Sequence, residues 1–143
     1  MDLNEKASAI SARTRTMAIR VRADFEELAM LRAVAETIAL VADFGIDEVT
    51  DIRLALEEVA TALIQDAVPE SELDCTIGYR DATMEIRVSA ITTSDSGPDQ
   101  HAIGWHIVST LTDSVTVAVD PSADIPDGYR TNVTFRWTRD GDQ

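Results

Sequence analysis

Cysteine is nearly absent from the chain, and long apolar runs are absent as well. The single cysteine, Cys75, excludes an intramolecular disulfide and fits a reducing compartment. No apolar run approaches the ~18 residues that a membrane-crossing helix needs, and residues 1–16 contain no apolar signal-peptide core. These absences favour a cytoplasmic protein with no membrane partner, in which Cys75 packs as a small apolar residue.

Lysine is equally rare, and anions outnumber cations. Lys6 is the only lysine, no Lys or Arg occurs between residues 88 and 129, and the formal net charge is −14. Nucleic-acid phosphates repel such a chain, whereas a basic protein partner would be attracted and would associate faster. The charge therefore argues against DNA or RNA binding, and it agrees with a basic protein partner or with simple solubility.

The 143 residues suit one domain. Residues 1–15 are small and polar and are expected to form a flexible tail, and residues 16–139 a single domain. Apolar periodicity predicts, in order, a strand at 17–21, helices at 24–43 and 47–67, strands at 73–80 and 83–91, a helix at 99–111, and strands at 115–119 and 131–138. Helices grouped beside hairpins are typical of an α+β two-layer sandwich, so we expect a mixed, mainly antiparallel sheet with three helices on one face.

Acidic residues and one glycine are expected to set the helix ends. Asp24, followed by Glu27, resembles a capping box at the start of the first helix, and Gly45 is expected to end it. Asp47 and Asp99 are predicted to cap the second and third helices.

The stretch 51–67 contains the candidate catalytic residue, Glu58. Its apolar positions recur at helical spacing: Ile52, Leu56, Val59 and Leu63. At about 100° per residue, Glu58 lies at one edge of this stripe, whereas Glu57 lies on the other side with Arg53 and faces water. Glu58 could then point into a cleft between helix and sheet and accept a proton from a water or hydroxyl. A solvated glutamate on an amphipathic helix is the alternative interpretation.

The outer face of the first helix combines charged and apolar residues. Arg32 and Glu36 are one turn apart and can form an ion pair, which in an exposed position is worth only ~0.3–0.5 kcal/mol. Phe25, Ala29 and Leu40 share this face. Exposed apolar residues at these positions indicate either a partner surface or ordinary surface composition.

Two stretches of the chain carry a resemblance to a known family. The segment DFEELAMLRAVAETIALVADFGIDEVTDIRLALEEVATALIQDA resembles the first two helices of the RsbW/SpoIIAB-type anti-sigma factors, and AIGWHIVSTLTDSV resembles their later glycine-containing segment. These are serine-protein kinases with the GHKL (Bergerat) ATPase fold. The resemblance covers residues 17–137, and the Trp105–His106 pair is similar to the UsfX-like anti-sigma-F branch.

The first nucleotide motif of the family is incomplete here. The family pattern is Glu-x-x-x-Asn, in which the Glu is the general base and the Asn a Mg²⁺ ligand. Glu58 matches the base, but Ala62 replaces the asparagine and offers no oxygen to a hard cation. The resemblance therefore assigns a catalytic role to Glu58 only if kinase activity is retained.

The remaining nucleotide motifs are also altered. Ala90 replaces the adenine-binding aspartate, Ala102 replaces the first glycine of the next box, and Gly104 retains the second. Only Thr131 remains of the final Gly-Thr pair, and the lid at 92–102 is short and acidic. Glu58, Gly104 and Thr131 are thus the residual cofactor-binding candidates, while ATP and Mg²⁺ are disfavoured. The histidines at 101 and 106 lack carboxylates at ligand spacing, so no metal site is expected.

The resemblance implies an anti-sigma factor that sequesters an alternative sigma factor and is released by a STAS-type anti-anti-sigma partner. It further implies a homodimer and places Ala29, Arg32 and Glu36 on the partner-binding face. Two alternatives remain: an active ATP-dependent serine kinase that phosphorylates its STAS antagonist, and a non-enzymatic dimeric sensor or regulatory module without a sigma partner.

Overall fold

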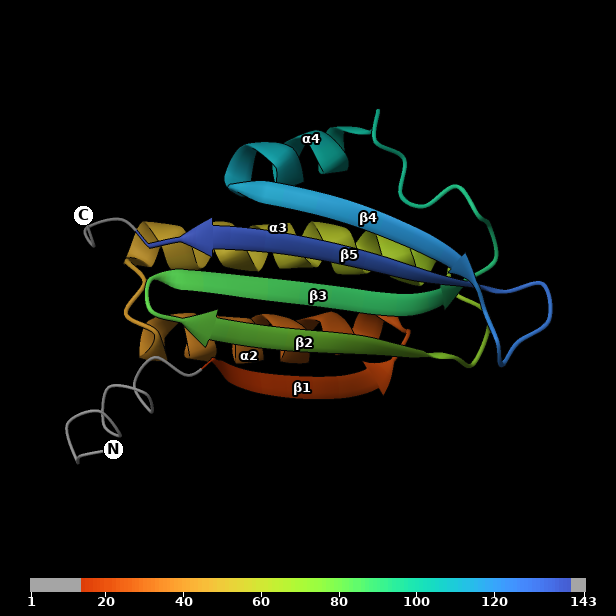
Figure 1. Cartoon of the computed structure of the whole chain (residues 1–143), viewed down its shortest axis with the longest axis horizontal. Coiled ribbons are helices and arrows are strands. Elements are labelled where there is room, and N and C mark those ends of the chain that lie inside the picture. The colour runs from red at the N-terminus through yellow and green to blue at the C-terminus, as the bar shows by residue number, and fades with distance from the viewer. Residues whose placement is uncertain (1–13, 140–143) are drawn as a thin grey trace, which may run out of the picture.

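The computed structural model describes residues 14–139, which form a helical layer on a sheet (Figure 1). The elements are β1 (Arg15–Arg22), the 3-10 helix η1 (Phe25–Glu27), α2 (Leu28–Val41), α3 (Ile46–Gln65), β2 (Glu72–Arg80), β3 (Thr83–Thr92), α4 (Ile103–Leu111), β4 (Ser114–Pro121) and β5 (Tyr129–Thr138). The predicted tail lies mostly outside the described residues, and β1 already begins at Arg15.

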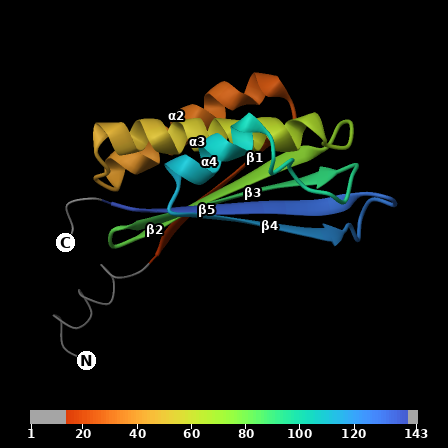
Figure 2. The same cartoon turned by 90° about the horizontal axis from the view of Figure 1, so that it is seen from above.

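The five strands form one sheet in the order β1-β2-β3-β5-β4. Every neighbouring pair is antiparallel, so the mixed component that we expected is not found among residues 14–139. A short turn joins β2 to β3, and Asp81 adopts a φ of 53° there, a left-handed conformation that aspartate tolerates better than most residues. Figure 2 shows α2, α3 and α4 on the same face of the sheet. The predicted α+β sandwich with three helices on one face is confirmed.

Residue alternation along the strands separates a buried face from an exposed one. The inward side chains of the three central strands are fully or almost fully buried: Leu73, Cys75, Ile77, Met84, Ile86, Val88, Val133, Phe135 and Trp137. The outward positions carry cations such as Arg20, whose Nε donates a hydrogen bond to Asp74 at 2.7 Å. This hydrogen bond, together with the charges of Asp74 and Glu72, raises the pKa of Arg20. Within residues 14–139, the outer sheet face is therefore polar, and no helix covers it.

The apolar stripe of α3 fills the space between the helices and the sheet. Ile52, Leu56 and Val59 have no exposed surface, and Leu63 has almost none. Burying a side chain of this size contributes about 1.5–3 kcal/mol relative to leaving it in water. Helix α3 is therefore the central element of the core, as its periodicity predicted.

Three predictions about helix ends were wrong: the Asp24 cap before α2, the end of α2 and the start of α3. The Asp24 side chain makes no capping bond, and a 3-10 turn precedes α2. Helix α2 ends at Val41, and Asp43 takes the left-handed conformation with a φ of 63°. Gly45 instead occupies the N-cap position before α3, where its N–H donates to Glu48 Oε1 at 3.0 Å.

Asp47 and Asp99 also do not cap their helices. Asp47 lies inside the first turn of α3, where its negative charge is favourable near the helix N-terminus. Asp99 accepts a hydrogen bond from the His101 N–H at 2.9 Å, three residues before the Ala102 cap of α4. Each aspartate is thus close to a helix start, but neither occupies the capping position.

Candidate functional site

A cleft of about 420 Å³ lies between α3, the loop at 92–102 and α4. Its lining residues are Glu58, Thr61, Ala62, Gln65, Asp66, Ser94, Gly97, Pro98, Asp99, Ala102, Gly104, Trp105 and Val108. Glu58 lines this cleft and faces α4, whereas we expected it to point into a cleft between helix and sheet; no strand residue among 14–139 lines the cleft. A Cβ on Gly104 would overlap Glu58 Oε2, so the absence of a side chain at Gly104 allows the carboxylate to lie against the first turn of α4.

The structure brings together only some of the residual nucleotide-binding candidates. Glu58 and Gly104 line the same cleft, with Ala62 and Ala102 beside them. Thr131 is fully buried in β5 and is not among the lining residues; its hydroxyl lies 2.8 Å from the hydroxyl of Thr92. Thr131 therefore has a structural partner inside the protein and contributes no atom to the cleft.

The lining of the cleft does not suit a magnesium–triphosphate group. Its charged side chains are Glu58, Asp66 and Asp99, and it contains no Lys or Arg. Phosphate oxygens need cationic or N–H donors, and three carboxylates would repel them. Ala62, in the place of the Mg²⁺-binding asparagine, provides no side-chain oxygen, and residues 14–139 contain no cluster of three His, Cys, Asp or Glu side chains that could hold a metal.

Asp66 fixes the loop that covers this cleft. Its Oδ1 accepts a hydrogen bond from the Thr93 hydroxyl at 2.5 Å, and its Oδ2 accepts from the Ser94 hydroxyl at 2.6 Å and the Ser94 N–H at 3.3 Å. The loop is thereby tied to the C-terminal end of α3. We did not predict this role for Asp66, because the sequence does not show that an aspartate after a helix meets hydroxyls some thirty residues later.

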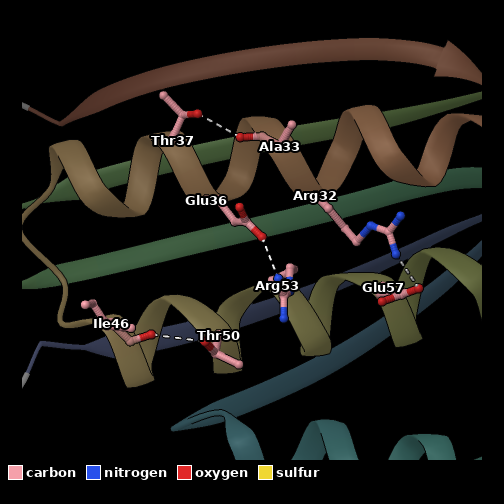
Figure 3. Close-up of polar contacts among 8 residues, drawn as sticks. All are labelled: Arg32, Ala33, Glu36, Thr37, Ile46, Thr50, Arg53 and Glu57. Carbon is pink, nitrogen blue, oxygen red and sulfur yellow. Dashed lines mark hydrogen bonds and ion pairs between the residues drawn. The ribbon is translucent and has the colours of Figure 1, made fainter.

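A second group of charges joins α2 to α3 on the outside of the helical layer. Arg32 Nη1 lies 3.0 Å from Glu57 Oε1, and Arg53 Nη1 lies 3.0 Å from Glu36 Oε1 (Figure 3). The four side chains are between 33% and 40% exposed. We call these four residues the charge seam.

The charge seam corrects two predictions. Arg32 and Glu36 are one turn apart and could have formed an ion pair along α2, but Arg32 reaches Glu57 on the neighbouring helix instead. Glu57 was expected to face water, yet it faces α2 and is half-buried. Periodicity placed Glu57 and Arg53 correctly on one side of α3, but it could not show that α2 lies on that side. Of the predicted partner-binding residues, Ala29 is exposed on α2 beside the seam.

Comparison with known proteins first identifies the fold. A chain of the SiaB–SiaC complex from Pseudomonas aeruginosa superposes with a TM-score of 0.66 at 9% identity, covering 96% of this chain and 99% of that one. A structure of the RsbU and RsbW domains of a Mycobacterium tuberculosis protein gives a TM-score of 0.58 at 12% identity, covering 87% and 34%. The chain therefore has the GHKL-like fold of RsbW-type domains.

The sequence comparison then identifies relatives. Anti-sigma-F factor RsbW, from two strains of Mycobacterium tuberculosis, is 32% identical over 101 residues, which is 71% of this chain. The chain spans 60% of the length of these curated relatives. No protein-family model matches it. The resemblance to RsbW-type anti-sigma factors is confirmed, and the relatives carry the anti-sigma-F name to which the Trp105–His106 pair was similar.

Among residues 14–139, no helix combines the length and the apolar composition that a membrane crossing requires.

Proposed function

We propose that this chain is an anti-sigma factor that binds and sequesters an alternative sigma factor without using a nucleotide, and that a STAS-type anti-anti-sigma partner releases it. The observation that carries this proposal is the similarity to anti-sigma-F factor RsbW over 101 residues. The lining of the cleft supports the second part, because it carries three carboxylates and no Lys or Arg to bind phosphate oxygens, and residues 14–139 contain no group of three His, Cys, Asp or Glu side chains that could hold a metal.

The electrostatics of the chain support a basic partner. A net charge of −14 attracts a protein with DNA-binding basic regions over long range and accelerates its encounter. The outer surface of α2, with Ala29, Arg32 and Glu36, is the proposed contact. The Arg32 guanidinium is half-exposed and donates to Glu57 through Nη1, so its other N–H groups can donate to a carboxylate of the partner. We further propose that the protein acts as a homodimer in the cytoplasm.

The alternative of an active serine kinase has one residue in its favour. Glu58 lies in the cleft and could accept a proton from a serine hydroxyl of a STAS antagonist. The kinase would also need the phosphate and metal contacts that the cleft lacks at Ala62 and Ala102. The other alternative, a dimeric sensor module, differs in having no sigma partner. Capture of a sigma factor separates it from the anti-sigma proposal.

The proposal can be tested by co-purification and by one substitution. The tagged full chain is co-expressed with each alternative sigma factor of its source organism, and captured pairs are measured by calorimetry. Arg32→Ala should weaken binding at least tenfold, in line with the ~2 kcal/mol typical of a desolvated interface arginine. It should lower the free energy of unfolding by only ~0.5 kcal/mol, because the ion pair is half-exposed.

The matched control is Arg87→Ala. Arg87 is an exposed arginine on the opposite, outer face of the sheet, where it pairs in register with Thr76. This variant should bind as the parent does. Failure of the parent chain to capture any sigma factor would contradict the proposed function, and equal binding by the Arg32 variant would move the contact to another surface.

A further inference from the structure

The charge seam has a regular geometry that a single pair would not show. Arg32 and Glu36 are one turn apart on α2, and Glu57 and Arg53 are one turn apart on α3. The second ion pair lies one turn further towards the C-terminus of α2 than the first, and one turn further towards the N-terminus of α3. This arrangement is expected for antiparallel helices that a short loop joins (Figure 3). Positive and negative charges therefore alternate both along each helix and across the pair.

Small side chains flank the charge seam, and part of the surface around it is apolar. On α2 the exposed neighbours are the small residues Ala29 and Ala33. On α3 the neighbours of the seam are Thr50 and Thr61, which are half-buried. Leu40 on α2 and Leu54 on α3 add exposed apolar surface. Small side chains beside a line of charges allow another helix to approach closely, as ridges and grooves require.

Acidic residues lie at both ends of the same helix pair. Glu26 precedes α2, and Asp43 and Asp47 lie where α2 leads into α3; all three are exposed. The seam itself contains two arginines and two glutamates and is neutral. The alternating charges at the centre of this surface are complementary to a helix that carries one acid and one base. The acidic residues at its two ends are complementary to a basic protein that carries such a helix.

We propose that the charge seam docks an amphipathic helix of the sigma factor, and that this helix contacts charges of α3 as well as α2. This rests on the proposed function and extends its contact surface to Arg53, Leu54 and Glu57. The docked helix has an acid and a base four residues apart, so that its acid meets Arg32 and its base meets Glu36. Its apolar positions cover Leu40 and Leu54. Each internal pair makes one Nη1–Oε1 contact within residues 14–139, which leaves further N–H groups and carboxylate lone pairs for the partner.

A charge swap separates recognition from stability. Arg32→Glu and Glu57→Arg are made singly and together, and each chain is measured by thermal unfolding and by calorimetry with the sigma factor that the parent captures. Each single swap places like charges against each other and should lower the melting temperature. The double swap restores an opposite-charge pair and should recover the parent melting temperature, but it reverses the charges that the partner meets. Its affinity should remain at least tenfold below that of the parent.

The second internal pair provides a replicate, and the sheet provides a control. Swapping Arg53 with Glu36 should give the same result: stability recovers and binding does not. Arg136 and Glu85 form a cross-strand pair on the outer sheet face, with Nε to Oε2 at 2.8 Å. Swapping these two residues should leave both stability and affinity at the parent values.

The possible results distinguish this proposal from the broader one. Recovery of affinity together with stability in both double swaps would overturn the seam proposal while leaving the anti-sigma function intact. If the parent captures no sigma factor, both proposals fail. Light scattering of the same variants covers a further outcome: a loss of self-association with unchanged sigma affinity would assign the seam to a second copy of this chain and overturn the proposal.

Discussion

We expect the protein to bind neither ATP nor Mg²⁺ at micromolar concentrations, and the expected weakening can be estimated from three altered motif positions. A micromolar site corresponds to about −8.2 kcal/mol. Ala62, Ala90 and Ala102 stand where the related motifs provide a metal ligand, an adenine acceptor and a flexible glycine. If each lost contact removes ~1.5–3 kcal/mol, the total is about 4.5–9 kcal/mol. Since 1.4 kcal/mol is tenfold, even the lower value weakens a micromolar site roughly a thousandfold, to millimolar.

The two tryptophans make this measurement direct. Trp105 lines the cleft, whereas Trp137 is 5% exposed in the core and donates a hydrogen bond to the Leu111 carbonyl at 2.6 Å. If ATP and Mg²⁺ did bind in the cleft, the fluorescence change would come from Trp105 and would be absent in Trp105→Phe. We expect no saturable change and no calorimetric heat below millimolar nucleotide. A micromolar dissociation constant that disappears in Glu58→Ala would refute this reasoning.

Three further predictions follow from burial and loop contacts. Iodoacetamide should modify Cys75 only after unfolding in urea, because burial raises the pKa of its thiol to about 12. The contribution of this buried thiol to the free energy of unfolding is present below the unfolded pKa near 9 and is lost as the pH rises towards 12. Leu56→Ala should lower the free energy of unfolding by about 2–5 kcal/mol, whereas Leu54→Ala, 38% exposed on the same helix, should cost below ~1 kcal/mol in urea titrations. Asp66→Ala should accelerate amide hydrogen exchange at Ser94 by removing its acceptor, and unchanged exchange would contradict the loop-fixing role.

Hydrophobic periodicity predicted most of the fold because each element buries one face. The helix at 47–67 became α3 with its predicted stripe in the core, and the alternation at 83–91 became β3. Helix caps were less predictable, since an aspartate close to a helix start competes with other local acceptors. Gly45 and Glu48 provide the contact at the start of α3 that we assigned to Asp47.

The candidate sites were predictable only as far as a single helix could define them. The angle of Glu58 on α3 predicted that it lies at the edge of the buried stripe, but it did not predict that α4 and the 92–102 loop, and not the sheet, form the cleft beside it. The pairing of Arg32 with Glu57 depends on which helix lies next to α2, and that is a tertiary contact between residues far apart in sequence. Thr131 was expected in the cleft from a motif position, but the register of β5 turns it into the core against Thr92.

The place of β5 in the sheet has a consequence for how the protein assembles. It is the last strand of residues 14–139, yet it lies between β3 and β4, and β4 pairs with no other strand in the described sheet. During synthesis, β4 therefore leaves the ribosome before its only hydrogen-bonding neighbour. Helix α4 is also expected to pack late, because the Trp137 indole N–H of β5 donates a hydrogen bond to the carbonyl of Leu111 at the C-terminal end of this helix. We expect amides of β4 and α4 to gain protection last in pulse-labelled refolding, so that the cleft closes only after the rest of the sheet has formed.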